Sequence, residues 1–174
     1  MVLALCVRKI MKMINVHNRV VNKPIAEVGA LLDSLSSNND NWWPYEKWSP
    51  MKFDRDLSEG AIGGHGPIKY VVTSYLPGKK INFEFIEPPG FHGNHWFELK
   101  EKEESKTEII HTINMNVSGV AVISWLIIIR YLHDALIEDS FDKAQKYFGI
   151  EAKTNNWSPW VRFLRFLLKR KKTT

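Results

Sequence analysis

Cysteine is almost missing from this 174-residue sequence, which contains only Cys6. A single cysteine excludes a disulfide framework and a cysteine-rich zinc site. It is typical of a reducing compartment, so we expect a cytoplasmic protein. No nucleophile motif surrounds Cys6, and we expect its thiol to be inert.

Long apolar runs are also missing from the sequence. The longest, residues 120–129, is half of the roughly 20 residues that cross a bilayer, and we predict no membrane-spanning helix.

The N-terminal stretch "MVLALCVRKIMKM" lacks the features of a signal peptide. Its apolar part is short, its charges follow that part instead of preceding it, and no cleavage site is evident. We expect residues 1–12 to be an extension of the domain, since Met11 or Met13 could equally serve as a start.

Acidic residues are missing from the C-terminal part, where none follows Glu151. The net charge of +5 arises there, because six of the 24 basic residues lie beyond residue 161. The other 18 basic residues are balanced by 19 acidic residues. A body without excess positive charge is a poor nucleic-acid surface, so we expect no nucleic-acid partner. The 44% hydrophobic and 25% charged residues are typical of one folded domain.

Residues 13–22 are rich in β-branched side chains and predict a strand, and residues 23–35 predict a short helix with Pro24 near its first turn. The glycine-rich stretch 60–66 lacks the spacing of a phosphate-binding loop and predicts a tight hairpin or bulge instead. Alternating apolar and polar residues predict further antiparallel strands over residues 66–76, 81–87, 94–103 and 106–119.

Residues 120–149 predict one long helix that ends near Gly149. At about 1.5 Å per residue, it is long enough to cross a whole sheet. Its first half is apolar nearly all round, and we expect a concave surface to bury it along much of its length. After a linker, Ser158 and Pro159 predict the start of a second, amphipathic helix.

This order of elements resembles the START/Bet v 1-like superfamily, also called SRPBCC. The resemblance is carried by "VHNRVVNKPIAEVGALLDS", the Trp-Pro of "NWWPYEKWSP", "TEIIHTINMNVSG" and the long helix after Gly119. It implies an α+β helix-grip fold over residues 13–149, in which a curved antiparallel sheet wraps around a long helix and leaves a cavity; residues 150–174 lie outside it. Members bind lipids, sterols, polyketides or hormones, and some resemble polyketide cyclases or dehydratases, lipid-transport proteins or co-chaperones.

If the sheet encloses a cavity, one face of its strands should line it, with mostly apolar side chains and a few polar groups. The alternative is that the same side chains pack solidly against the long helix, and the sequence leaves both open. The residues on that face are Tyr70, Val72, Ser74, Phe83, Phe85, Phe97, Leu99, His111, Ile113 and Met115.

Three tryptophans stand in the irregular segment "NNDNWWPYEKWSPMKFDRD", residues 38–56. We predict that Trp42, Trp43 and Trp48 cover the end of the sheet–helix sandwich and contact the ligand, since one such ring removes about 150–250 Å² from water. The alternative is a structural plug without ligand contact.

The six histidines include an H-x-x-H spacing at His92 and His95, with His65 and His111 elsewhere. Zinc needs three or four convergent ligands, and neither H-E-x-x-H nor a cysteine pair is present, so we expect no metal and no other cofactor. His111 points inward by alternation. It could act as a general acid or base near Tyr70 or Glu87, or it could be a core histidine or a polar ligand contact.

The C-terminal stretch 157–174 combines cationic residues at helical spacing with tryptophans and leucines on the opposite side. This pattern is typical of an interfacial helix on anionic lipid. The alternative is a helix that docks on its own domain or on a partner chain. The stripe is Arg162, Arg165, Lys169 and Lys172, and the residues predicted to contact membrane are Trp157, Trp160, Arg162, Arg165 and Lys169.

Together these features predict a protein without catalytic activity that binds or transfers a hydrophobic small molecule, such as a lipid, quinone or polyketide-like compound, at a membrane surface. The Trp-rich segment or the loop 88–93 would gate the cavity. One alternative is a cyclase or dehydratase for an aromatic polyketide-like substrate, with His111 as acid or base. Another is a co-chaperone-like interaction module, which the polar outer face of the predicted sheet disfavours: Lys69, Thr73, Glu84, Glu98, Lys100, Thr112 and Asn114.

Overall fold

A computed structural model describes residues 10–151 and 156–170, and the side chains of these residues except Lys169 and Arg170. The expectations for Cys6, for most of the N-terminal extension and for Lys172 concern residues outside these ranges.

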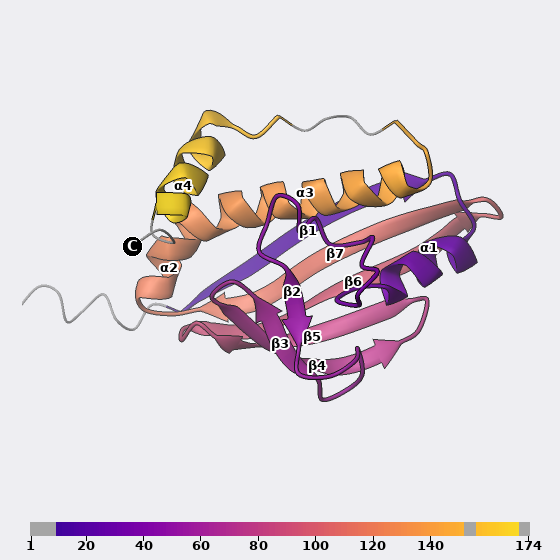
Figure 1. Ribbon diagram of the computed structural model, residues 1–174. Helices are drawn as coiled ribbons and strands as arrows, with labels where there is room; N and C mark the ends of the chain where they lie inside the picture. Colours follow the sequence, from indigo (N-terminus) through magenta and orange to yellow (C-terminus); the bar gives the residue numbers. More distant parts are fainter. Residues whose placement is uncertain (1–9, 152–155, 171–174) are drawn as a thin grey trace, which may run out of the picture.

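Seven strands form one antiparallel sheet in the order β1-β7-β6-β5-β4-β3-β2 (Figure 1). Strand β1 lies at the edge of the sheet beside β7, the last strand in the sequence, with Met11 opposite Val117 and Val21 opposite Thr107. The strands are β1 (Met11–Val21), β2 (Met51–Phe53), β3 (Ile62–His65), β4 (Ile68–Leu76), β5 (Lys80–Glu87), β6 (Phe91–Glu103) and β7 (Lys106–Val117).

The long helix runs from Val120 to Tyr147 and crosses the concave side of the sheet (Figure 1). Its consecutive parts are α2 (Val120–Ser124), a π-helical turn η2 (Trp125–Ile129) and α3 (Arg130–Tyr147). Gly149 ends it in a left-handed conformation, as predicted. Helix α1 (Ile25–Asp33) covers one end of the sheet, and α4 (Pro159–Arg170) returns to the start of the long helix. This arrangement confirms the α+β helix-grip fold with an extra C-terminal helix.

Two short strands, β2 and β3, were not predicted, because three or four residues show no alternation. They form by pairing, with Met51 opposite His65 and Phe53 opposite Gly63. Gly63 permits this pairing, since a Cβ there would lie 2.1 Å from the carbonyl oxygen of Lys52. The hairpin from β3 to β4 turns at Gly66 and confirms the expected turn in the glycine-rich stretch.

One strand boundary and one side-chain direction on the sheet differ from the prediction. Strand β6 begins at Phe91, inside the expected loop 88–93, because Phe91 pairs with Val117. Ser74 does not face inward: a register shift after Val72 places it opposite Asn82, and Tyr75 packs on the core instead.

The interior divides into two apolar clusters. The main core lies around α1 and the C-terminal half of α3, where Leu32, Trp42, Phe97 and Phe141 are fully or almost fully buried. The second core lies near the start of the long helix and includes Phe91, Ile113, Met115, Val117 and Trp125. Most of the side chains predicted to face inward belong to one of these clusters.

The first half of the long helix is exposed, contrary to the expected burial. Val120 is 81% exposed and Ile127 is 49% exposed, because the sheet covers only one side of the helix. By length and composition alone, the helix Val120–Tyr147 could cross a membrane, a test that core helices also pass.

The outer face of the sheet is mostly polar, as predicted, but β1 is an exception. Ile14 and Val16 project outward from β1 and are 63% and 55% exposed. Thr112, which was expected to be exposed, is buried between Val16 and Trp96 on the neighbouring strands.

Candidate functional site

Three histidine rings form a layer between the two apolar cores. His95 on β6 and His111 on β7 have ring centres 5.6 Å apart, and His133 on α3 lies 5.0 Å from His111. Strand alternation turns His95 and His111 inward, while the long helix brings His133 down onto them. We call His95, His111 and His133 the imidazole layer.

Aromatic rings enclose the imidazole layer on several sides. His95 has its ring 4.7 Å from both Tyr70 and Phe83, and His111 lies 4.6 Å from Phe97. His133 lies 6.2 Å from Trp125 in the second core. The layer is therefore a group of polar rings enclosed by aromatic side chains.

Several polar atoms in this interior have no hydrogen-bond partner among the described residues. They include Tyr70 Oη, His95 Nε2 and His111 Nδ1. All three residues are buried, with exposures of 0%, 6% and 1%. An unpaired buried polar group costs about 1–3 kcal/mol, so these atoms call for a polar partner such as water or a bound molecule.

The groups of this interior are held neutral by their burial. Burial, together with the nearby imidazole of His133, lowers the pKa of His95 and of His111 well below the ordinary value. Burial also lowers the pKa of His65 to about 3 and raises the pKa of Tyr70 well above its usual value. A neutral phenol and neutral imidazoles can each donate one hydrogen bond, and an imidazole can also accept one.

A charged network joins β1 to α3 at the edge of the sheet. Arg19 binds Glu138 at 2.6 Å and Asp142 at 3.0 Å. His17 lies between two carboxylates, with Nε2 3.1 Å from Asp134 Oδ1 and Nδ1 2.8 Å from Glu138 Oε1. Burial lowers the pKa of His17, but these two partners outweigh burial and raise it to about 9.

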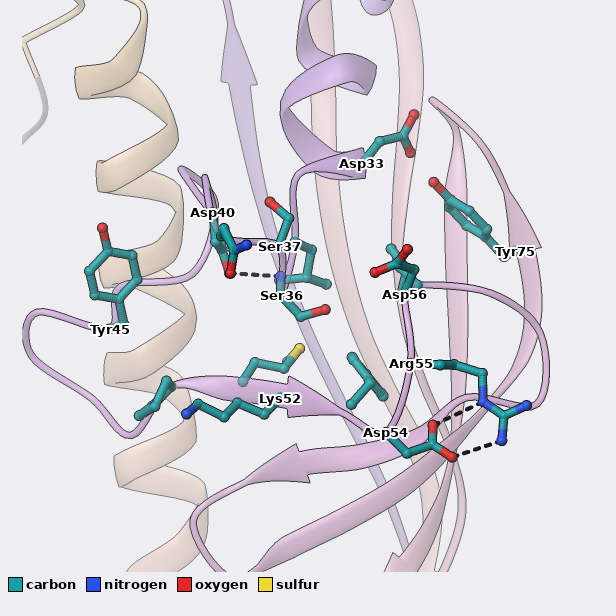
Figure 2. A pocket seen from close by; sticks show the side chains of 16 residues that line it. Asp33, Ser36, Ser37, Asp40, Tyr45, Lys52, Asp54, Arg55, Asp56 and Tyr75 are labelled. Atoms are coloured by element: carbon teal, nitrogen blue, oxygen red, sulfur yellow. Dashed lines mark hydrogen bonds and ion pairs between the residues drawn. The ribbon is translucent and has the colours of Figure 1, made fainter.

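A cleft of about 770 Å³ opens at the end of α1, beside β2 and the turn that follows it (Figure 2). Its rim is polar and carries Asp33, Asp40, Asp54, Asp56 and Arg55. None of the residues predicted to line the cavity lines this cleft.

The inner wall of the cleft leads toward the imidazole layer. Phe53 lines the cleft and also packs against the main core. Its ring centre lies 5.9 Å from that of Tyr70 and 6.1 Å from that of Phe83. Phe53 therefore contacts both the cleft and the aromatic rings around His95.

The tryptophans of the irregular segment have two different positions. Trp42 and Trp43 are buried, and the carboxylate of Asp40 accepts both of their backbone N–H groups. Trp42 packs on Phe97 with ring centres 5.4 Å apart, inside the main core. Trp48 lies further out and donates its indole N–H to Asp139 on α3. Ligand contact by the three tryptophans stays a prediction.

The inward-facing strand residues are buried on the concave side of the sheet, and their role in lining a cavity stays a prediction. In the structure their rings contact one another, as between Tyr70 and Phe83 at 5.0 Å. The buried residues of this set, besides partly buried Phe85, are Tyr70, Val72, Phe83, Phe97, Leu99, His111, Ile113 and Met115.

The possible pairing of His111 with Glu87 is wrong. Glu87 is exposed at the end of β5, opposite Lys69, and His133 stands beside His111 instead. His92 and His95 point to opposite faces of β6, so the H-x-x-H spacing does not bring them together. His133 and His17 were missed, although Asn15, His17 and Arg19 alternate on one face of a strand.

The C-terminal helix docks on its own domain through part of the predicted membrane surface. Trp157 donates its indole N–H to Asp139 at 2.9 Å, and the guanidinium of Arg165 lies 4.0 Å from the ring centre of Trp48. Trp160 and Arg162 are exposed, although Trp160 donates to the carbonyl of Ile127. The side chain of Lys169 lies outside the described ones.

Comparisons with solved structures identify the same architecture in other proteins. A scan against protein families and a search of curated proteins find no match. A protein from Thermobifida fusca has a TM-score of 0.60 at 14% identity, over 82% of this chain and 98% of that chain. Norcoclaurine synthase from Thalictrum flavum, in complex with dopamine and hydroxybenzaldehyde, has a TM-score of 0.63 at 12% identity, over 86% and 94% of the chains.

A conserved protein of unknown function from Enterococcus faecalis has a TM-score of 0.55 at 10% identity, over 93% of this chain and 86% of that chain. At such low identities these similarities show the fold alone. The chain shares the helix-grip fold with these proteins.

Proposed function

We propose that this protein binds a neutral hydrophobic molecule that carries an oxygen, such as a quinone, a polyketide-like compound or an uncharged lipid, between the sheet and the long helix. The observation that carries this proposal is the set of buried, unpaired polar atoms on Tyr70, His95 and His111 among the described residues. An apolar interior with a few convergent polar groups is what a site for a small hydrophobic molecule requires.

The chemistry of these groups favours a neutral oxygen over an anion. The rings in contact with His95 and His111 are aromatic or imidazole rings, and burial keeps both histidines uncharged. A carbonyl or hydroxyl oxygen could accept from the Tyr70 hydroxyl and from an imidazole N–H. A carboxylate or phosphate would be buried without a cation, at a much higher cost.

The cleft beside β2 offers a route to this site. Its volume of about 770 Å³ is within the usual range of a small-molecule pocket, and Phe53 contacts both the cleft and Tyr70. Movement of this one ring would connect the cleft to the interior. A protein of the same fold, norcoclaurine synthase, has been solved with two aromatic molecules, so the fold can hold a ligand of this class.

Quenching of tryptophan fluorescence by menadione, a neutral quinone, tests the proposal. We expect Tyr70→Phe and His111→Leu each to weaken binding about 5- to 10-fold, since each loses one hydrogen bond of about 1 kcal/mol. Tyr147→Phe, at an exposed ring, should bind like the wild type. Native mass spectrometry of protein purified from its own cells would identify a retained ligand. Equal quenching in all variants, or no quenching in the wild type, would contradict the proposal.

A second candidate is a cyclase or dehydratase, and the position of His111 favours it. His111 has two further ionisable rings, His95 and His133, within 5.6 Å. Its lowered pKa keeps the resting imidazole unprotonated, so it would have to accept a proton from a bound substrate before it could donate one. Turnover of an aromatic polyketide-like substrate that is lost in His111→Gln would support this activity over simple binding.

We also propose that the start of the long helix and α4 together contact an anionic membrane surface. Trp160 of α4 binds the carbonyl of Ile127, so the two exposed apolar helices adjoin. Exposed arginine on α4, Arg162, and the basic residues that follow it in sequence complement anionic lipid. The apolar residues of this surface are Val120, Ile123, Leu126, Ile127, Ile128, Trp160, Phe163, Leu167 and Leu168.

Co-sedimentation with vesicles of phosphatidylcholine and phosphatidylserine tests this surface. We expect the double variant Ile123→Ser/Phe163→Ser to lose most of its binding, because both side chains are about half exposed and would enter the lipid. Ile14→Ser/Val16→Ser, on the outer face of β1, is the matched control. Equal sedimentation of both double variants would remove the proposed role.

A further inference from the structure

Two histidines and an aspartate converge where β1 meets α3. The nearest ligand-type atoms of His17, His133 and Asp134 all lie within 4.8 Å of one another. His17 comes from a strand at the sheet edge, whereas His133 and Asp134 are neighbours on the long helix. Long-range packing alone brings this group together, which explains why no spacing in the sequence indicates it.

We propose that His17, His133 and Asp134 bind a divalent first-row transition-metal ion, with zinc as the reference ion. Two imidazole nitrogens and one carboxylate oxygen are donors that suit zinc, iron and cobalt. Three protein ligands leave a further position open on the ion. The inference goes beyond the proposed ligand site, because its donors point to a metal and not to an organic molecule.

His17 Nε2 lies within hydrogen-bond distance of Asp134, but the separations in this group also match those between two ligands of one ion. His133 Nδ1 lies 3.6 Å from Asp134 Oδ1, which is too long for a hydrogen bond. The nitrogen is buried and has no hydrogen-bond partner within the described part of the chain. Two ligands on a tetrahedral ion with bonds of about 2.0–2.1 Å stand roughly 3.3 Å apart, close to this separation and to the 3.1 Å between His17 Nε2 and Asp134 Oδ1.

Glu138 orients His17 for this role. The Nδ1 atom of His17 lies 2.8 Å from Glu138 Oε1. When an ion is bound, the N–H group at Nδ1 would donate to this carboxylate, and the lone pair of Nε2 would be left for the ion. Arg19 in turn holds the other oxygen of Glu138 at 2.6 Å. A carboxylate behind a metal-binding histidine is a recurring arrangement that fixes the tautomer and strengthens the ligand.

Asn15 completes one side of the group. Its amide nitrogen donates to Asp134 Oδ1 at 2.9 Å, which holds the carboxylate toward His17. Its amide oxygen is buried, and no partner for it exists within residues 10–151 and 156–170 as described. This oxygen, or a water molecule, would supply a fourth ligand.

A protonated His17 held between two carboxylates is the competing explanation, and cobalt binding distinguishes the two. Tag-free, chelator-treated full-length protein would be titrated with Co²⁺, whose visible absorption reports four- or five-coordinate sites, and Zn²⁺ would then compete in calorimetry. We expect one ion per chain. We expect Asp134→Asn and His133→Gln to weaken binding at least 100-fold and Glu138→Gln to weaken it 10- to 100-fold.

His92→Gln is the matched control, since His92 is exposed on the opposite face of β6, and it should bind like the wild type. Circular dichroism would establish that each variant is folded. In the wild type itself, Zn²⁺ should shift the imidazole nitrogen resonances of His17 and His133, which needs no variant. Absence of Co²⁺ binding, unshifted resonances, or full binding by Asp134→Asn and His133→Gln would overturn the proposal. Menadione binding is measured in a separate experiment, so a failure of the metal proposal can be distinguished from a failure of the proposed ligand-binding function.

Discussion

The indole rings of Trp48 and Trp157 lie 5.7 Å apart, and both donate their N–H groups to one carboxylate, that of Asp139. Trp48 belongs to the irregular segment and Trp157 precedes α4, so this contact joins two segments far apart in sequence to the long helix. Lys47 adds an ion pair at 2.6 Å to the same carboxylate, whose side chain is 1% exposed. The contact explains how the C-terminal helix is held against the domain.

The first prediction concerns this carboxylate. We expect Asp139→Leu to lower the free energy of unfolding by about 3–5 kcal/mol, because it leaves Lys47 and two indole N–H groups without their acceptor. Trypsin should then cut within α4, as helix docking is weakened. Urea unfolding and limited proteolysis would measure both effects. Glu103→Gln, in an exposed pair with Lys106, should change stability by less than about 1 kcal/mol.

The second prediction is a loss of stability at alkaline pH. The folded pKa of His17, about 9, lies above its value of 6.5 in the unfolded chain. Its stabilising contribution is therefore complete below pH 6.5 and disappears as the pH rises through 9. We expect a loss of roughly 2 kcal/mol after solvent screening, measured by urea unfolding in the presence of a chelator. His17→Asn should abolish this dependence, and a wild type with constant stability from pH 6.5 to 9 would contradict it.

The third prediction is a loss of stability on the acid side. His65, His95 and His111 have folded pKa values below 6.5, so the unfolded chain binds more protons as the pH falls below that value. Each of these histidines can lower the free energy of unfolding by about 1.4 kcal/mol for each pH unit of acidification. Urea unfolding between pH 6.5 and 5 should show a slope that approaches the sum of these three terms, with a further contribution from His133, whose pKa is also lowered by burial. A flat profile would show that the buried imidazoles are protonated in the folded state.

Much of the fold follows from local pattern. Alternation predicts β5 and β7 within a residue or two, because one face of each is buried and the other is wet. The same reasoning fails for β2 and β3, which exist only because Met51 and Phe53 find partners across the chain. It also fails for the first half of the long helix, since composition does not show which side of an apolar helix remains uncovered.

The candidate site is also predictable only in part, because some of its residues meet through contacts between distant parts of the chain. His111 follows from strand alternation, but its neighbour His133 depends on how the long helix lies on the sheet. His17 had a local signal, in the polar residues that alternate with exposed Ile14 and Val16 on β1. Such inward polar positions on an edge strand require partners, and Asp134 and Glu138 on the long helix supply them.

The fourth prediction separates stability from function at His111. The ligand-free protein holds His111 Nδ1 buried without a described partner. Replacement by an apolar side chain of similar size removes this penalty, so His111→Leu should leave stability at pH 7 unchanged or raise it by about 1 kcal/mol. The same variant should lose quinone affinity. His92→Leu, at an exposed position, should change neither property. A large destabilisation by His111→Leu would show that the imidazole has a stabilising partner.

The fifth prediction concerns access to the interior. Phe53 lies parallel to Phe83, with 9° between the ring planes, and lines the cleft. Phe53→Ala removes this ring, and we expect the association rate of menadione, measured by stopped-flow quenching, to rise several-fold.

Phe53→Ala also removes packing contacts of a partly buried ring, which should lower the free energy of unfolding by about 2–3 kcal/mol. Thermal unfolding would therefore be used to establish that the variant is folded. Leu76→Ala, which removes an exposed apolar side chain from β4, is the matched control and should keep the wild-type rate. If the ligand enters elsewhere, Phe53→Ala and Leu76→Ala will bind menadione at the same rate.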